Sequence, residues 1–111
     1  MKAFIQISTA TNSKVSADKI AKNLLQERLA ACVQVVGPIH TSYWWNGKLE
    51  HAKEWLCLVK ARLKDYPRIE GAIRRAHPYE IPEVLASPIV QGSVTYLRWL
   101  QRETYRKRKA S

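Results

Sequence analysis

One short stretch of the 111-residue chain brings imidazole and carboxylate groups together with two prolines: His77-Pro78-Tyr79-Glu80-Ile81-Pro82-Glu83. Proline fixes φ and has no N–H to donate, so this stretch is expected to be extended and rigid. One imidazole with carboxylates can supply nitrogen and oxygen ligands to copper(II) or zinc. The stretch therefore predicts a weak divalent-metal site at His77, with Glu80 and Glu83 as further ligands.

His77 also has a structural interpretation, because the helix that precedes it must end before Pro78. An imidazole at that position would be stabilised by the negative end of the helix dipole. The other histidines, His40 and His51, lie in a predicted hairpin where they can share a face with Ser42. We expect these two to be plainly exposed on their strands.

No catalytic constellation is readable, since none of the three histidines lies in a motif with Ser or Cys. The two cysteines, Cys32 and Cys57, fall in predicted strands and form no Cys-x-x-Cys. We expect them to be small buried hydrophobes. The four glycines are not clustered, so no phosphate cradle is predicted. The sequence thus predicts no enzyme and no firm cofactor, beyond a divalent metal ion such as copper or zinc.

The elements that would hold these groups are organised around a long hairpin over residues 31–62. Asn46-Gly47 suits a two-residue type I′ turn, in which both central residues have positive φ. Trp45 would then face Lys48. Gly37-Pro38 predicts a bulge in the first arm, because proline cannot donate to the ladder.

The second arm of the hairpin is apolar on both faces. Trp55, Cys57 and Val59 alternate with Leu56 and Leu58. Two helices can cover only one face of a small sheet, so a partner chain is expected to cover the other.

Four further elements complete the predicted fold. Residues 2–9 alternate as a strand, and a helix capped by Ser13 or Ser16 follows. A second helix starts at Asp65, residues 84–90 form an edge strand, and Ser93 caps a last helix. The order is βαββαβ with an extra C-terminal helix. It predicts an α+β, ferredoxin-like sandwich as a single domain over residues 1–105, followed by a basic tail over 106–111.

Nineteen Lys and Arg against nine Asp and Glu give a formal net charge of +10. This charge and the ferredoxin-like order would suit an RNA-binding module. Residues 49–56, however, lack the Lys/Arg-Gly-aromatic-x-aromatic pattern that stacks bases, which disfavours nucleic acid. No apolar run is long enough to span a membrane, and a cytoplasmic location is expected.

Four blocks of the sequence together resemble the CutA divalent-cation tolerance family. They are Glu27-Arg28-Leu29-Ala30-Ala31-Cys32-Val33, Tyr43-Trp44-Trp45-Asn46-Gly47-Lys48, the His77–Glu83 stretch and Tyr96-Leu97-Arg98-Trp99-Leu100. The resemblance covers almost the whole chain apart from the basic tail. It implies a ferredoxin-like homotrimer with its sheets packed inward, and a link to tolerance of copper and other divalent ions. An alternative by analogy of fold is a trimeric small-molecule or nucleotide-sensing signal protein of the nitrogen-regulatory type.

The chain departs from that family at two positions where some bacterial members hold copper. Ser8 stands at the position of a cysteine and Ala76 at that of the first of two histidines, which leaves His77 alone. A hydroxyl is a poor ligand for a soft metal and a methyl group is none. Tight copper binding is therefore not expected.

Overall fold

The computed structural model describes residues 3–106 and contains four strands and three α-helices in the expected order. Their bounds are β1 Phe4–Thr11, α1 Lys14–Gln26, β2 Ala30–Trp45, β3 Lys48–Arg62, α2 Tyr66–Ala76, β4 Leu85–Ile89 and α3 Val94–Glu103. A short 3₁₀ turn over Leu63–Asp65 joins β3 to α2. No helix among residues 3–106 is long and apolar enough to cross a membrane.

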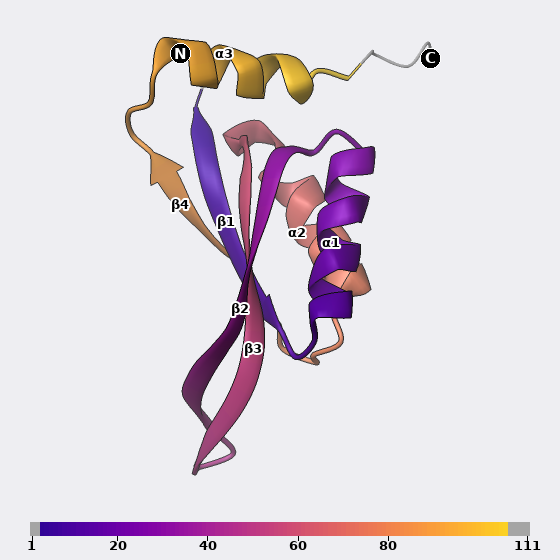
Figure 1. Cartoon of the computed structure of the whole chain (residues 1–111), viewed down its shortest axis with the longest axis vertical. Coiled ribbons are helices and arrows are strands. Elements are labelled where there is room, and N and C mark those ends of the chain that lie inside the picture. Colours follow the sequence, from indigo (N-terminus) through magenta and orange to yellow (C-terminus); the bar gives the residue numbers. More distant parts are fainter. Residues whose placement is uncertain (1–2, 107–111) are drawn as a thin grey trace.

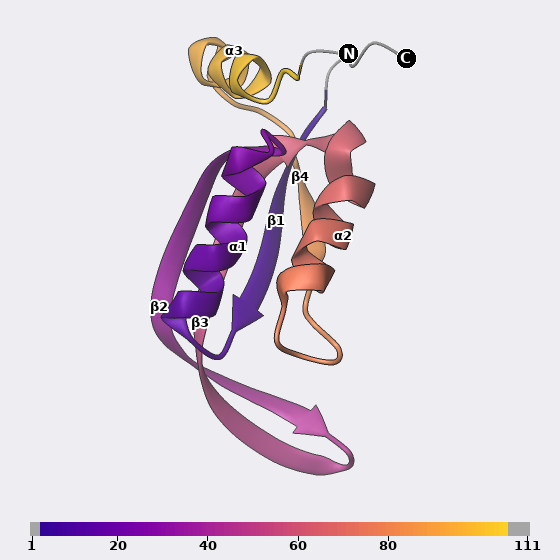
Figure 2. The same cartoon turned by 90° about the vertical axis from the view of Figure 1, so that its right-hand side faces the viewer.

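The four strands form one antiparallel sheet in the order β2-β3-β1-β4. Helices α1 and α2 lie side by side against one face of this sheet (Figures 1 and 2). This arrangement confirms the α+β, ferredoxin-like sandwich. It also confirms that β4, which contains Pro88, is an edge strand.

The core lies between the sheet and the two helices and follows from the two periodicities of the sequence. Every second residue of β1 and β3 points at the helices, as Ile7 and its partner Val59 do, and both are fully buried. Residues three and four apart on the helices pack against these strand residues, as Ile69 and Ile73 of α2 do. Leu25 of α1 is exposed.

The hairpin has the predicted turn and register. Asn46 has φ 50° and Gly47 has φ 76°, the positive pair that a type I′ turn requires, and Trp45 pairs with Lys48. The register shifts between Val36 and Ile39, which confirms the bulge at Gly37-Pro38. Beyond this bulge the two arms twist away and extend past the layered body of the molecule (Figure 2).

The face of the sheet opposite α1 and α2 is here called the open face. Register places Ser8, Val36, Leu56, Leu58 and Leu85 on it together. Helix α3 lies at one end of the molecule and contacts β2 and β3 (Figure 1), so it leaves most of this face uncovered. Leu56 and Leu58 are half-buried, while Val36 is 46% exposed and Leu85 63% exposed.

The structure has helix caps at Ser13 and Ser93, as predicted, but Asp65 does not cap α2 with its side chain. The Ser13 hydroxyl accepts from the Ser16 amide and the Ser93 hydroxyl from the Tyr96 amide, so Ser13 rather than Ser16 caps α1. Asp65 precedes α2 as expected, but its carboxylate makes no cap hydrogen bond. It is buried and forms ion pairs with two arginines instead.

Those two arginines are Arg62, at the end of β3, and Arg106, which follows α3. Arg106 Nη2 lies 2.6 Å from Asp65 Oδ1, and Arg62 Nε lies 3.3 Å from Asp65 Oδ2. Arg106 Nη1 also donates to the carbonyl oxygen of Arg28 at 2.9 Å. Arg106, which the sequence assigns to the basic tail, thus contacts the folded domain, while the predicted boundary after residue 105 stays a prediction. The rest of that tail, residues 107–111, lies outside the described residues.

A pair of truncations tests this boundary. Deletion of residues 106–111 is expected to lower the free energy of unfolding by about 1–2 kcal/mol relative to deletion of 107–111, because it leaves the buried Asp65 with one arginine instead of two. Equilibrium unfolding in urea measures the difference. Equal stability of the two truncated chains would show that Arg106 contributes nothing to the fold.

Candidate functional site

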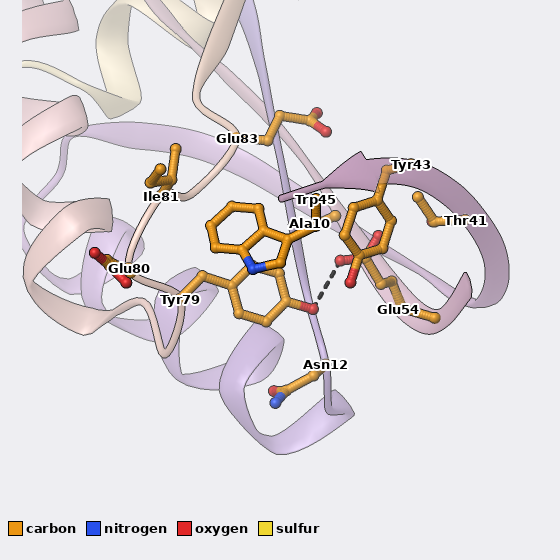
Figure 3. Close-up of a pocket in the computed structure, with 11 residues that line it drawn as sticks. Ala10, Asn12, Thr41, Tyr43, Trp45, Glu54, Tyr79, Glu80, Ile81 and Glu83 are labelled. Atoms are coloured by element: carbon orange, nitrogen blue, oxygen red, sulfur yellow. Dashed lines mark hydrogen bonds between the residues drawn. The ribbon is translucent and has the colours of Figure 1, made fainter. Parts of the chain in front are cut away.

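A hollow near the predicted site residues lies between the hairpin and the segment that follows α2 (Figure 3). Its volume is about 520 Å³. The side chains that line it are mostly apolar or aromatic, with three carboxylates among them. They are Ala10, Asn12, Thr41, Tyr43, Trp45, Ala52, Glu54, Tyr79, Glu80, Ile81 and Glu83.

The alternation of the two hairpin strands explains how this hollow forms. Thr41 pairs with Ala52, so odd-numbered residues of β2 and even-numbered residues of β3 share a face here. That face carries Tyr43 and Trp45 from one strand and Glu54 from the other. The rigid segment between α2 and β4 supplies the opposite wall (Figure 3).

A hydrogen bond between Tyr79 and Glu54 ties the two walls together. The Tyr79 hydroxyl donates to Glu54 Oε2 at 2.7 Å. Burial raises the pKa of Tyr79, and the hydrogen bond to the Glu54 carboxylate raises it further. The phenol is therefore a hydrogen-bond donor at neutral pH, and the Glu54 side chain, only 6% exposed, is held in place by it.

His77 fastens the same segment to the sheet. Strand β4 pairs with β1 only as far as Ser8, and beyond that point His77 Nε2 donates to the carbonyl oxygen of Ala10 at 2.9 Å. The other ring nitrogen, Nδ1, accepts from the Tyr79 amide at 3.1 Å. Both nitrogens of the neutral ring are thus used in structural hydrogen bonds.

The environment of His77 favours the neutral ring. Its side chain is 9% exposed, and burial lowers its pKa below the ordinary 6.5 although the Ala10 carbonyl, Glu54 and Glu83 all act to raise it. The expected role as a charged helix end stabilised by the dipole is therefore replaced by that of a buried, neutral hydrogen-bonding group.

The predicted metal ligands do not form a metal centre within the chain. His77 has no lone pair free, while Glu80 and Glu83 lie exposed along the hollow. Among residues 3–106 there is no group of three or more His, Cys, Asp or Glu side chains placed to hold a metal ion. The donor set thus does not fit a resident metal, and ligation by His77, Glu80 and Glu83 stays a prediction.

The remaining candidate residues lie apart from the hollow. His51 Nδ1 is 2.9 Å from the Ser42 hydroxyl on the exposed hairpin, where His40 is exposed as well. Both cysteines are free, with Cys57 buried as expected and Cys32 only partly so. Burial raises the pKa of the Cys57 thiol to about 11, with Asp18 adding to the shift, so this thiol is unreactive.

Sequence reasoning missed Glu54 and the aromatic residues of the hollow as members of the site. A signal for Glu54 was present, because it directly precedes Leu56 and Leu58 on the same face of β3. An acid in such a position needs a buried partner. The identity of that partner, Tyr79, is 25 residues away in the chain and has no local signature.

Solved structures share this fold closely. The structure of CutA1 from Oryza sativa has a TM-score of 0.90 and 32% sequence identity, covering 95% of this chain and 96% of that one. The structure of CutA from Xylella fastidiosa has a TM-score of 0.89 and 31% identity, covering 92% of this chain and 98% of that one. The chain is thus a small α+β protein of the ferredoxin-like class to which these structures belong.

Sequence comparison places the chain within that class. The family described as CutA1 divalent ion tolerance protein matches residues 5–103. The divalent-cation tolerance protein CutA of Thermus thermophilus is 40% identical over 92 residues, covering 83% of this chain and 89% of the relative. Protein CutA of Homo sapiens is also 40% identical, over 86% of this chain, which spans about half (53%) of the human protein. The chain belongs to the CutA1 divalent ion tolerance protein family.

The buried neutral His77 makes a prediction about acid stability. Its pKa is lowered in the folded protein, so the unfolded chain takes up a proton at higher pH than the folded one, and stability falls as the pH drops below about 6.5. His77→Gln, which keeps an amide donor for Ala10, is expected to lose less stability than the wild type between about pH 7.5 and about pH 5.

Urea unfolding at the two pH values measures this effect. His40→Gln, at an exposed histidine of the hairpin, is the control and is expected to keep the wild-type acid sensitivity. The same loss in His77→Gln as in the wild type would contradict the buried neutral ring.

Proposed function

We propose that this protein acts in tolerance of divalent cations, copper foremost, as a homotrimer. Family membership is the observation that carries this proposal, because the relatives are named for tolerance of divalent cations and not for a reaction. No enzyme activity is proposed. The expected cytoplasmic location stays a prediction.

The open face supports self-association. Leu56, Leu58, Val36 and Leu85 form an apolar surface that α1 and α2 cannot reach, because both helices lie on the opposite face of the sheet. An exposed apolar surface of this kind typically marks an interface. The long hairpin extends beyond the body of one chain, and this extension suits packing against a neighbouring chain. The number three rests on the family resemblance.

The metal ion in this proposal is bound cargo, not a resident cofactor. The rigid segment offers Glu80 and Glu83 at the hollow, and exposed carboxylates can take a divalent ion without rearrangement of the core. For His77 to bind the metal ion, Nδ1 would have to lose the hydrogen bond that it accepts from the Tyr79 amide. Weak, exchangeable binding agrees with a role in tolerance better than with a role in catalysis.

The assembly is tested by sedimentation equilibrium. The wild type is expected at three times the 12.8 kDa of one chain, and Val36→Glu is expected as a monomer because it places a charge on the apolar open face. Val15→Glu, at a valine 79% exposed on α1, is the matched control and keeps the trimer. A monomeric wild type, or a trimeric Val36→Glu, would contradict this interface.

Metal binding is tested by calorimetric titration with copper(II), zinc and manganese. The expected affinity is roughly micromolar or weaker and decreases from copper to zinc to manganese, the general order for such ligands. The double variant Glu80→Gln/Glu83→Gln is expected to lose this binding, whereas Glu27→Gln, at an exposed carboxylate after α1, retains it. His77→Ala shows whether the ring takes part. Unchanged binding in the double variant would remove the rigid segment from the site.

A further inference from the structure

We propose that the hollow between the hairpin and the segment after α2 binds a small organic cation, a primary or quaternary amine attached to an apolar body. Three aromatic side chains, Tyr43, Trp45 and Tyr79, line the hollow together with Glu54 (Figure 3). This inference goes beyond the proposed role in metal tolerance and does not depend on it.

Glu54 is a buried carboxylate with one oxygen left for a ligand to bind. Its side chain is more than nine-tenths buried, and Tyr79 satisfies only Oε2. Oε1 has no hydrogen-bond partner among residues 3–106 and is not among the fully enclosed polar atoms, and Glu54 is one of the residues that line the hollow. A carboxylate oxygen held in this way is a ready acceptor for an ammonium N–H or a counter-charge for a quaternary amine.

The aromatic rings supply the second part of the recognition. None of the rings of Tyr43, Trp45 and Tyr79 stacks on another of the three, and none is covered by a Lys or Arg side chain within the described chain, whereas the Tyr79 ring packs at a tilt against the His77 ring, with 4.9 Å between centroids. The rings of Tyr43 and Trp45, 41% and 42% exposed, are therefore available to a ligand, and the face of an aromatic ring attracts a cation. Tyr79 contributes both its ring and the hydroxyl that fixes Glu54.

The charge around the hollow selects the sign of the ligand. The chain has 19 Lys and Arg, yet none of those among residues 3–106 lines this hollow, whereas Glu54, Glu80 and Glu83 do. A cation is therefore favoured over an anion despite the net charge of +10.

Size and spacing favour an organic cation over a metal ion at the same place. The three carboxylates do not come together as a metal-binding group in the described chain, so they cannot all contact one ion. A molecule with a ring and an amino group can touch Glu54 and the aromatic wall at once. The volume of about 520 Å³ is in the range of small-molecule sites.

Calorimetric titration of the assembled protein with phenethylamine, in buffer with a metal chelator, tests the proposal. Phenethylamine is expected to bind at about millimolar affinity or tighter, as suits a ligand of this size in a formed hollow. 2-Phenylethanol, which has the same ring and no charge, is expected to bind about tenfold more weakly. The chelator separates this result from metal binding.

Two variants locate the binding. Glu54→Gln is expected to weaken phenethylamine binding about tenfold or more. Glu50→Gln, at an exposed carboxylate of β3 that does not line the hollow, is expected to bind as the wild type. Should Glu54→Gln not fold, Trp45→Leu keeps the wall apolar and is expected to lower the ratio of amine to alcohol affinity about fivefold.

Three results would overturn the proposal. The first is equal affinity for phenethylamine and 2-phenylethanol, which would mark a merely apolar hollow. The second is an effect of Glu54→Gln, or of Trp45→Leu in its place, no larger than that of Glu50→Gln. The third is no binding of phenethylamine by the wild type up to about 10 mM.

Discussion

The β2–β3 ladder is the interaction on which the rest of the structure depends. It runs from Ala30 paired with Ala61 to Trp45 paired with Lys48, and it is longer than the two helices that pack on the sheet. Its inner part builds the core through Val59 and its neighbours. Its outer part extends past the body of the domain, where neither α1 nor α2 packs on it. The hollow follows from this mismatch in length.

The segment after α2 forms the other wall of the hollow, and two hydrogen bonds attach this segment to the sheet. His77 joins it to the free carbonyl of Ala10 on β1, and Tyr79 joins it to Glu54 on β3. Both residues act as neutral donors, His77 to a backbone carbonyl and Tyr79 to a carboxylate. The two prolines reduce the conformations that the segment would lose on folding, which lowers the entropic cost of holding it against the sheet.

Features set by neighbours in sequence were predictable, and features set by distant residues were not. The turn at Asn46-Gly47, the bulge beside Pro38 and the cap at Ser93 each depend on a few adjacent residues, and the structure confirms all three. The pairing of Arg106 with Asp65 joins residues 41 apart, and a basic run after a helix looks the same whether or not one arginine finds a buried acid. The sequence predicts His77 as a metal ligand, which stays a prediction, and the hydrogen bond of His77 to Ala10 depends on where β4 stops pairing with β1.

Both outer strands of the sheet carry a proline, and this has a consequence for the protein at high concentration. β2 lies at one edge with 16 residues, long enough to template another strand, and β4 lies at the other with five. Pro38 and the register shift beside it divide the long edge, and Pro88 offers no N–H on the short one. Open edges of this kind invite strand-by-strand growth into fibrils. Here a proline interrupts the row of backbone donors on each edge, which disfavours such growth from a chain with an extended, aromatic-rich hairpin.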